Sequence, residues 1–442
     1  MIRSLYCLIV IALLLGTVGA ADPQPAADPD ATRVEIGFEE RVRSENMDNL
    51  NDWAADNPDA RRWWRFRSRL WARLNLGQRA ELYLGLNNET RKTTEPDTPL
   101  KFDEIIFENL YLDLALNRQW SVKAGRQNLV RGEGFLFIEG NPLDGSRTAY
   151  FNAVDITWSP VQDLKLELIG ISNPDHDIYL PRINDKHKTL IEWDEEAIGV
   201  YATDRTRRGQ SLDAYYFYKK ESGDTRDPSH PQYQPERRVH TLGGRLEQTV
   251  GGGWSAAGEL AGQWGGQHPD TPIRAMGGYA YVKKAFTHDW KPTAQFGYWG
   301  FSGDDPTTPA NENWDPLFNR WPKWSELYIY SQLPEKGLAY WTNTRMWHAE
   351  ATVAPRPWAK GRVSYYHLGA SHPYPGNPTV FAGGTNRGDM FQIRVDIIPA
   401  ESWRGHVVYE RFWPGDFYDG SSPGYFFRFE VIYTIKGVFA WN

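Results

Sequence analysis

Apolar and polar residues alternate one by one through many short segments of this chain. One segment has apolar side chains at every odd position from Phe391 to Ile397, with Gln392, Arg394 and Asp396 between them. Successive side chains of a β-strand point to opposite faces. This period of two therefore predicts strands with one apolar face and one polar face.

Eighteen such segments follow one another, each close to the length of about ten residues that a tilted membrane strand needs. They are residues 33–43, 62–75, 79–88, 104–116, 119–127, 147–158, 163–171, 194–203, 209–219, 237–249, 253–264, 273–286, 290–301, 342–354, 360–370, 387–398, 402–412 and 424–436. After the N-terminal residues, no stretch reaches the roughly 18 apolar residues of a membrane helix.

The connections between these segments alternate in length, long and then short, along the whole chain. Short ones include Gly77 and 117–118, and long ones include 44–61, 128–146 and 302–341. Bacterial outer-membrane barrels have short periplasmic turns, long outer loops and an even number of strands. The pattern predicts an all-β transmembrane antiparallel barrel of eighteen strands, with sixteen as the alternative count. A soluble sandwich or propeller has no reason to alternate in this way.

The N-terminal residues indicate where the protein goes. An apolar run over 5–15 follows Arg3 and precedes a string of small residues, which is typical of a secretory signal peptide. We predict a signal peptide over 1–21 and a flexible, Pro- and Asp-rich lead over 22–32, so that the barrel occupies 33–442. The single cysteine lies in the signal peptide, so we expect no disulfide and no thiolate metal site. The expected location is the outer membrane of a Gram-negative bacterium.

Composition agrees with a barrel but does not require one. Mean hydropathy is -0.60 although aromatic residues make up 14% of the chain. A soluble carbohydrate-binding β-protein has such a composition, and so does a membrane barrel with aromatic girdles. The net charge of -7 and the absence of long basic runs give no indication of nucleic-acid binding.

If the apolar faces contact lipid, the polar faces line the lumen, and arginine is their commonest basic residue. Four arginines on one strand form a positive ladder with steps of about 7 Å. Guanidinium groups bind carboxylates through two parallel hydrogen bonds. The predicted lumen residues are Arg65, Arg67, Arg69, Arg73, Lys165, Glu167, Arg245, Glu247, Arg362, Arg394, Asp396, Arg404, His406, Glu410, Arg428 and Glu430.

The acidic residues of this set have two interpretations. They neutralise neighbouring arginines and brace the wall, or they select among anions that pass. In both interpretations the lumen carries charges of both signs, which argues against a phosphate pore with a purely positive lining.

Neither catalysis nor a cofactor is expected. No nucleophile motif surrounds the histidines, and no glycine-rich phosphate loop is present. One loop combines histidines and aspartates, namely Asp175, His176, Asp177, Asp185 and His187. We interpret it as a solvated polar loop, with a loop Ca²⁺ or Zn²⁺ site as the alternative.

Five segments resemble the alginate export family of outer-membrane porins. They are WWRFRSRLWARL (63–74), AGRQNLVRGEG (124–134), NPLDGSRTAYFNAV (141–154), WDPLFNRWPKWSE (314–326) and YERFWPGDFYD (409–419). The resemblance implies an eighteen-stranded barrel whose arginine-rich constriction passes an anionic uronic-acid polysaccharide out of the periplasm. The matching positions are Arg65, Arg67, Arg69, Arg126 and Arg147.

Arg126 departs from this scheme, because it has the same parity as Trp120, which we assign to the lipid face. A bulge near the strand end, or a position beyond the hydrocarbon band, would reconcile the two.

The leading hypothesis is an anion-selective channel that exports an acidic saccharide. A porin that takes up small carboxylates or anions is the alternative, and a surface adhesin or structural barrel, binding through loop 302–341, is a third. The expected partners are outer-membrane lipid, an anionic saccharide and a periplasmic export partner. We expect a monomer that does not bind nucleic acid.

Overall fold

The computed structural model describes residues 31–57, 59–102, 105–138, 150–181, 183, 193–223, 235–319, 323–327, 341–376 and 378–441. Eighteen long antiparallel strands form one sheet, and the two-residue strand β4 pairs with one of them, β3. The strands are β1 (Thr32–Asp48), β2 (Arg61–Leu76), β3 (Ala80–Glu95), β4 (Lys101–Phe102), β5 (Ile106–Ala115), β6 (Trp120–Gln127), β7 (Phe151–Trp158), β8 (Leu164–Asn173), β9 (Glu195–Asp204), β10 (Gln210–Glu221), β11 (Arg237–Gly251), β12 (Trp254–Gln267), β13 (Thr271–Ala285), β14 (Thr293–Phe301), β15 (Thr344–Arg356), β16 (Ala359–Gly369), β17 (Asn386–Ala400), β18 (Trp403–Pro414) and β19 (Gly424–Trp441).

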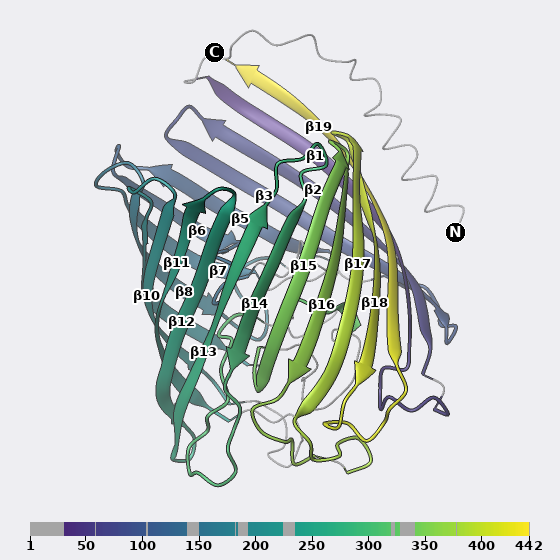
Figure 1. The fold of residues 1–442 in the computed structure, drawn as a ribbon. Helices are drawn as coiled ribbons and strands as arrows, with labels where there is room; N and C mark the ends of the chain where they lie inside the picture. Colours follow the sequence, from purple (N-terminus) through teal and green to yellow (C-terminus); the bar gives the residue numbers. More distant parts are fainter. Residues whose placement is uncertain are drawn as a thin grey trace.

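The sheet closes into a barrel (Figure 1). Strand β1 pairs with β2 on one side and with β19 on the other, so that Thr32 lies opposite both Leu76 and Trp441. Closure leaves no long strand with an unpaired edge. The predicted eighteen-stranded antiparallel barrel is confirmed.

Several strands continue beyond their predicted ends. Strand β3 runs to Glu95 rather than to residue 88, and β19 runs to Trp441 rather than to residue 436. Alternation of side chains reveals only the part of a strand that has one polar and one apolar face. The backbone hydrogen bonds between strands continue beyond that part.

Short and long connections lie at opposite ends of the barrel, which we call the turn end and the loop end. At the turn end, β11 and β12 are joined by Gly252 and Gly253, whose φ angles are 56° and 79°. Left-handed backbone of this kind favours glycine in tight hairpins. At the loop end, β14 stops at Phe301 and β15 begins only at Thr344. This asymmetry places the loop end outside the cell.

The outer surface of the barrel carries the apolar side chains. Exposed aromatic residues form two rings on it, as the girdles of membrane barrels do. Near the loop end these are Trp64, Trp264, Trp347, Tyr365 and Trp413. Near the turn end they are Trp120, Trp254, Phe286, Trp290, Trp358, Trp403 and Phe439. The barrel therefore spans a membrane through its strands.

The inside of the barrel holds charged side chains that a soluble protein would place on its surface. Arg41, Arg43, Arg67 and Arg428 are all 2% exposed or less. An apolar core also lies inside, toward the loop end, where connecting segments fold inward. As for helices, the described residues contain none that is long and apolar enough to cross a membrane.

Candidate functional site

Charged side chains fill the inner face of the wall formed by β18, β19, β1, β2, β3 and β5. Strand β1 contributes four of them because alternate residues point inward, and neighbouring strands supply partners of opposite charge. We call this set the arginine–glutamate network. Its members are Glu39, Arg41, Arg43, Glu45, Arg65, Arg67, Arg69, Glu89, Glu108, Arg404, Arg428 and Glu430.

Four of the five carboxylates in the network pair with two or more guanidinium groups. Glu45 lies 2.6 Å from Arg428 and 3.4 Å from both Arg43 and Arg65. Arg65 also lies 2.9 Å from Glu89. Removing one partner of such a buried pair leaves an uncompensated charge, which is strongly destabilising. This part of the lumen wall is therefore braced, as the neutralising interpretation of the acidic residues predicts.

Charged side chains of the lumen wall are more accessible toward the turn end. The side chains of Arg73 and Arg404 are 39% and 49% exposed, and Arg394 is 27% exposed. Two cavities of about 660 and 680 Å³ lie here and share Arg69 and Arg404. We call the two neighbouring cavities together the vestibule. Nine basic and seven acidic residues line it, whereas acidic residues predominate in the whole chain.

One side of the vestibule carries a stacked pair of tyrosines. The rings of Tyr83 and Tyr111 are 5.3 Å apart and nearly parallel. Lys123 lies 3.9 Å over the Tyr111 ring, and Arg73 lies 5.5 Å over the Tyr83 ring. The rings cover each other and the cations lie over them, so this side presents ring edges, phenol groups and positive charge, which suits a ligand that combines hydroxyl groups with a carboxylate.

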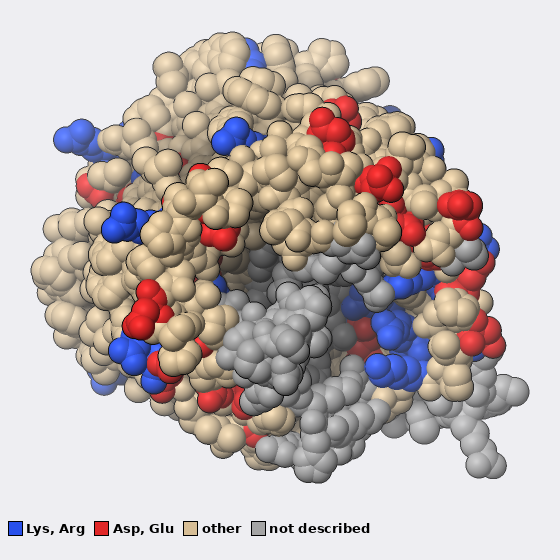
Figure 2. Space-filling view, turned by 90° about the horizontal axis from the view of Figure 1, so that it is seen from below, with Lys and Arg blue, Asp and Glu red and all other residues tan. Residues whose placement is uncertain are grey.

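Two connections fold into the loop-end half of the lumen. Phe137, which follows β6, stacks on Phe318, which follows β14, with centroids 5.2 Å apart. Asn319 donates hydrogen bonds to the Gly134 and Phe135 carbonyl groups, at 2.5 and 2.6 Å. The described parts of these two loops thus narrow the lumen. Viewed from the loop end, the molecule has a central recess with basic side chains gathered along one side (Figure 2).

Charged contacts tie the inward loops to each other and to the wall. Lys323 donates to the Glu133 carboxylate at 2.8 Å, and Tyr281 donates to the same group at 3.0 Å. Burial alone would raise the pKa of Glu133, but the Lys323 ammonium and these hydrogen bonds lower it below its usual value. Glu410 accepts hydrogen bonds from Ser325 and from two backbone N–H groups nearby. Glu410 therefore holds a loop in place.

The structure places the other predicted lumen residues as follows. Arg245 contacts Glu247 at 2.6 Å and Tyr279 at 3.2 Å. Arg362 donates to Gln392 at 3.1 Å, and Arg394 lies 2.7 Å from Asp396. The remaining partners are His406 with Glu430, at 3.2 Å, and Glu167 with Arg131, at 2.7 Å. Arg147 lies outside the described residues.

Arg126 does not join the lumen residues. It shares the outward parity of Asn152, to which it donates at 3.0 Å, and it forms two hydrogen bonds of 2.8 and 2.9 Å with Asp177 in the segment after β8. Its guanidinium also lies 4.0 Å over the Tyr150 ring. Burial alone would raise the pKa of Asp177, but Arg126 holds it below its usual value. Arg126 is thus an anchor for a loop at the end of its strand.

Asp177 belongs to the loop considered as a metal site. Among the described residues, no group of three or more potential metal ligands occurs. His187 and Asp185 lie outside that part of the chain.

Some functional residues escape prediction from the sequence. Arg41 and Arg43 are absent from the predicted set, although the E-E-R-V-R-S-E segment places them at alternate positions with Glu39 and Glu45. The outward position of Glu40, which accepts a hydrogen bond from Ser68 at 2.5 Å, obscures the apolar face that would have marked this strand.

Comparison with known proteins adds a family and a fold. A family model described as Alginate export matches residues 32–427. No curated protein sequence matches the chain. The fold is similar to crystal structures of Pseudomonas aeruginosa proteins. OpdQ has 8% identity and a TM-score of 0.58, with 92% of this chain and 98% of that chain covered. OccK2 (OpdF) in complex with glucuronate has 12% identity and a TM-score of 0.56, with 91% and 98% covered.

Proposed function

The chain belongs to the alginate export family, and on that premise we propose that it is an anion-selective channel that exports an acidic saccharide of the uronic-acid type. Family and fold together support an outer-membrane channel of a Gram-negative cell, and they point to a transporter. Anion selectivity and the class of cargo are the proposal.

The vestibule is the observation that carries it. Arg69, Arg73 and Arg404 reach into one space beside the Tyr83–Tyr111 stack. A uronic acid has a carboxylate for the guanidinium groups and hydroxyl groups for the phenol groups and ring edges of the tyrosines. Each cavity has the volume of a typical small-molecule site, about 300–1,000 Å³. The two together would hold more than one sugar unit, as a chain in transit requires.

A second candidate function is uptake of small carboxylates. Glucuronate is named as the ligand of OccK2 (OpdF), which shares the fold, and the inward loops narrow this lumen. The adhesin hypothesis finds no such support, because the described aromatic residues of loop 302–341 are buried, namely Trp314, Phe318, Trp324 and Trp341.

Planar-bilayer recording tests the proposal. The wild-type channel is expected to pass anions over cations and to be blocked by uronate oligomers but not by neutral sugars. Block by monomeric carboxylates alone would favour uptake, and absence of conductance would refute both channel hypotheses.

The double substitution Arg394→Ser/Arg404→Ser sharpens the test. A unit charge about 8 Å from the ion contributes about 0.5 kcal/mol in a water-like dielectric, so removal of two is expected to lower the permeability to anions about fivefold and to raise the permeability to cations by a similar factor. Arg238→Ser, on the outward face near the loop end, is the matched control. Unchanged selectivity in the double variant would contradict an arginine-based filter.

A further inference from the structure

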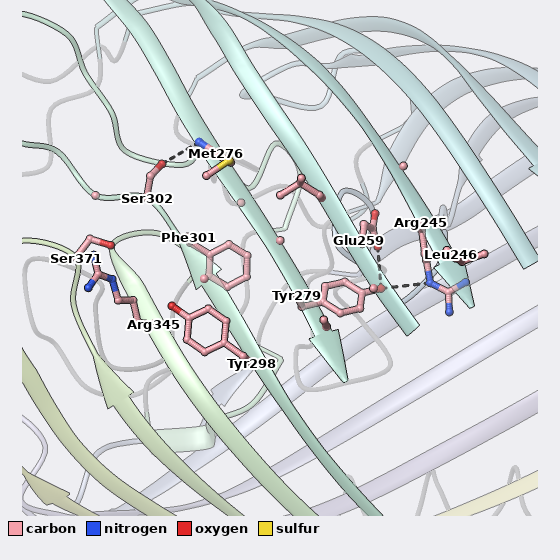
Figure 3. Close-up of a pocket in the computed structure, with 18 of the residues that line it drawn as sticks. Arg245, Leu246, Glu259, Met276, Tyr279, Tyr298, Phe301, Ser302, Arg345 and Ser371 are labelled. Atoms are coloured by element: carbon pink, nitrogen blue, oxygen red, sulfur yellow. Dashed lines mark hydrogen bonds between the residues drawn. The ribbon is translucent and has the colours of Figure 1, made fainter. Parts of the chain in front are cut away.

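A shallow groove of about 790 Å³ crosses the outer wall of strands β11 to β14 (Figure 3). Its floor consists of small outward-facing residues from four neighbouring strands: Gly244, Gly258, Gly278, Ala280 and Gly300. Larger apolar side chains stand around this floor, namely Leu246, Leu260, Met276 and Tyr298. The register aligns the floor, since Gly278 lies opposite both Leu260 and Gly300.

Hydrogen bonds on the inner face of the barrel hold the wall behind the groove in place. Tyr279 donates a hydrogen bond to Glu259 at 2.8 Å and accepts one from Arg245 at 3.2 Å, as Figure 3 shows. The floor is therefore a shaped surface rather than a gap that the wall can close. Membrane lipid must cover it, because a void against an apolar wall forfeits the dispersion contacts on one side.

The end of the groove nearest the loops carries one basic side chain, Arg345, and its lining segment Ser302–Gly303 continues into Asp304 and Asp305. Arg345 is exposed on the outer face and lies opposite Gly300, next to the groove floor. It is two residues beyond Trp347 of the loop-end aromatic girdle, so its guanidinium lies near the level of lipid head groups. No ion pair joins Arg345 to any of the described residues. Ser371 and His372 also line this end.

We propose that this groove binds a phosphorylated glycolipid of the outer leaflet. An acyl chain lies over the glycine floor, and the phosphate pairs with Arg345. The Arg345 guanidinium favours a phosphate head group, because guanidinium and phosphate form bidentate hydrogen bonds. The loop end faces outward, which selects the outer leaflet. The groove lies on the outer surface of the barrel, whereas the vestibule lies inside it. The proposed lipid site therefore does not depend on what the channel carries.

Two substitutions address the two halves of the site. Arg345→Gln removes the charge, and Ala280→Phe fills the floor at a residue that already has a Cβ. Arg411→Gln, an outward arginine near Trp413 on β18, and Ala351→Phe, an outward alanine on β15, are matched controls outside the groove. The probe is rough lipopolysaccharide, titrated into the folded, detergent-solubilised chain and counted by native mass spectrometry, with phosphatidylglycerol in a parallel titration.

Arg345→Gln is expected to weaken lipopolysaccharide binding about tenfold, which corresponds to about 1.4 kcal/mol. Ala280→Phe is expected to weaken it at least as much, and both controls should bind as the wild type does. Wild-type binding by Arg345→Gln and Ala280→Phe would overturn the proposal. Equal affinity for phosphatidylglycerol would overturn the assignment to an outer-leaflet glycolipid. Bilayer conductance should be unchanged in Arg345→Gln, so failure here is distinct from failure of the proposed channel function.

Discussion

Replacing Glu45 by glutamine tests how strongly the arginine–glutamate network stabilises the barrel. The substitution keeps the shape of the side chain and removes its charge. Glu45 is fully buried and accepts from Arg428 at 2.6 Å and from Trp63 Nε1 at 2.5 Å, with Arg43 and Arg65 at 3.4 Å. Glutamine would leave three guanidinium groups around a neutral amide.

The expected loss follows from this burial. Breaking a buried ion pair by removing one partner costs about 3–5 kcal/mol. The amide oxygen still accepts one hydrogen bond, so we expect about 3 kcal/mol for Glu45→Gln. If water filled the lumen around these groups, the same change would cost about 1 kcal/mol or less, as exposed ion pairs do. The two cases are far enough apart to measure.

Urea unfolding of the barrel in lipid vesicles, followed by tryptophan fluorescence, measures the difference. Glu401→Gln is the control, because this glutamate lies in an exposed turn, and it should stay within about 0.5 kcal/mol of the wild type. A Glu45→Gln barrel as stable as the control would refute the inference that the network is a desolvated brace.

Three further outcomes are expected. The double substitution Tyr83→Leu/Tyr111→Leu should weaken block by uronate oligomers about tenfold, because each aromatic contact contributes about 0.5–1.5 kcal/mol. The reversal potential should stay unchanged. The control, Tyr365→Leu on the outer face, should alter neither the block nor the reversal potential. Lys323→Met removes a partly exposed tie between the inward loops worth about 1 kcal/mol or less, so single-channel conductance should rise modestly. Arg126 lowers the pKa of Asp177 below the usual aspartate value of 3.8, so their ion pair persists at neutral pH. Hydrogen-exchange protection of the segment after β8 should therefore be constant near pH 7 and be lost only below pH 3.8. Loss of protection near pH 6 would contradict this.

Alternation of side chains predicts the strands because each strand separates lipid from a polar interior. It also places the lumen arginines of β2 correctly, where Trp64 and Leu70 are exposed outside and Arg65 and Arg67 are buried inside. A period of two cannot reveal a bulge, however. Glu108 is left unpaired in the register of β3 and β5, so that it and Asn109 are both buried, and Glu108 thereby reaches Arg69.

The loops escape prediction for a different reason. Their aromatic residues have no periodicity, and an exposed binding loop and an inward-folded one have the same composition. What decides between them is long-range contact, such as Phe137 on Phe318 and Asn319 on the backbone at Gly134. The role of Arg126 could not be predicted from the sequence for the same reason, because its partner Asp177 is 51 residues away along the chain.

For the proposed anion transport, a lumen lined with arginines must avoid self-repulsion and still leave cations available to a passing anion. Glu39 shows how both conditions are met. It pairs with Arg67 at 3.0 Å, with Arg69 at 3.6 Å and with Arg404 at 2.5 Å. Arg67 is buried, whereas Arg404 is about half exposed, so a carboxylate arriving from the vestibule would take Arg404 while Glu39 keeps Arg67. The exchange replaces one ion pair by another and changes the free energy little. Binding of this kind is weak and reversible, which is the condition for conduction rather than retention.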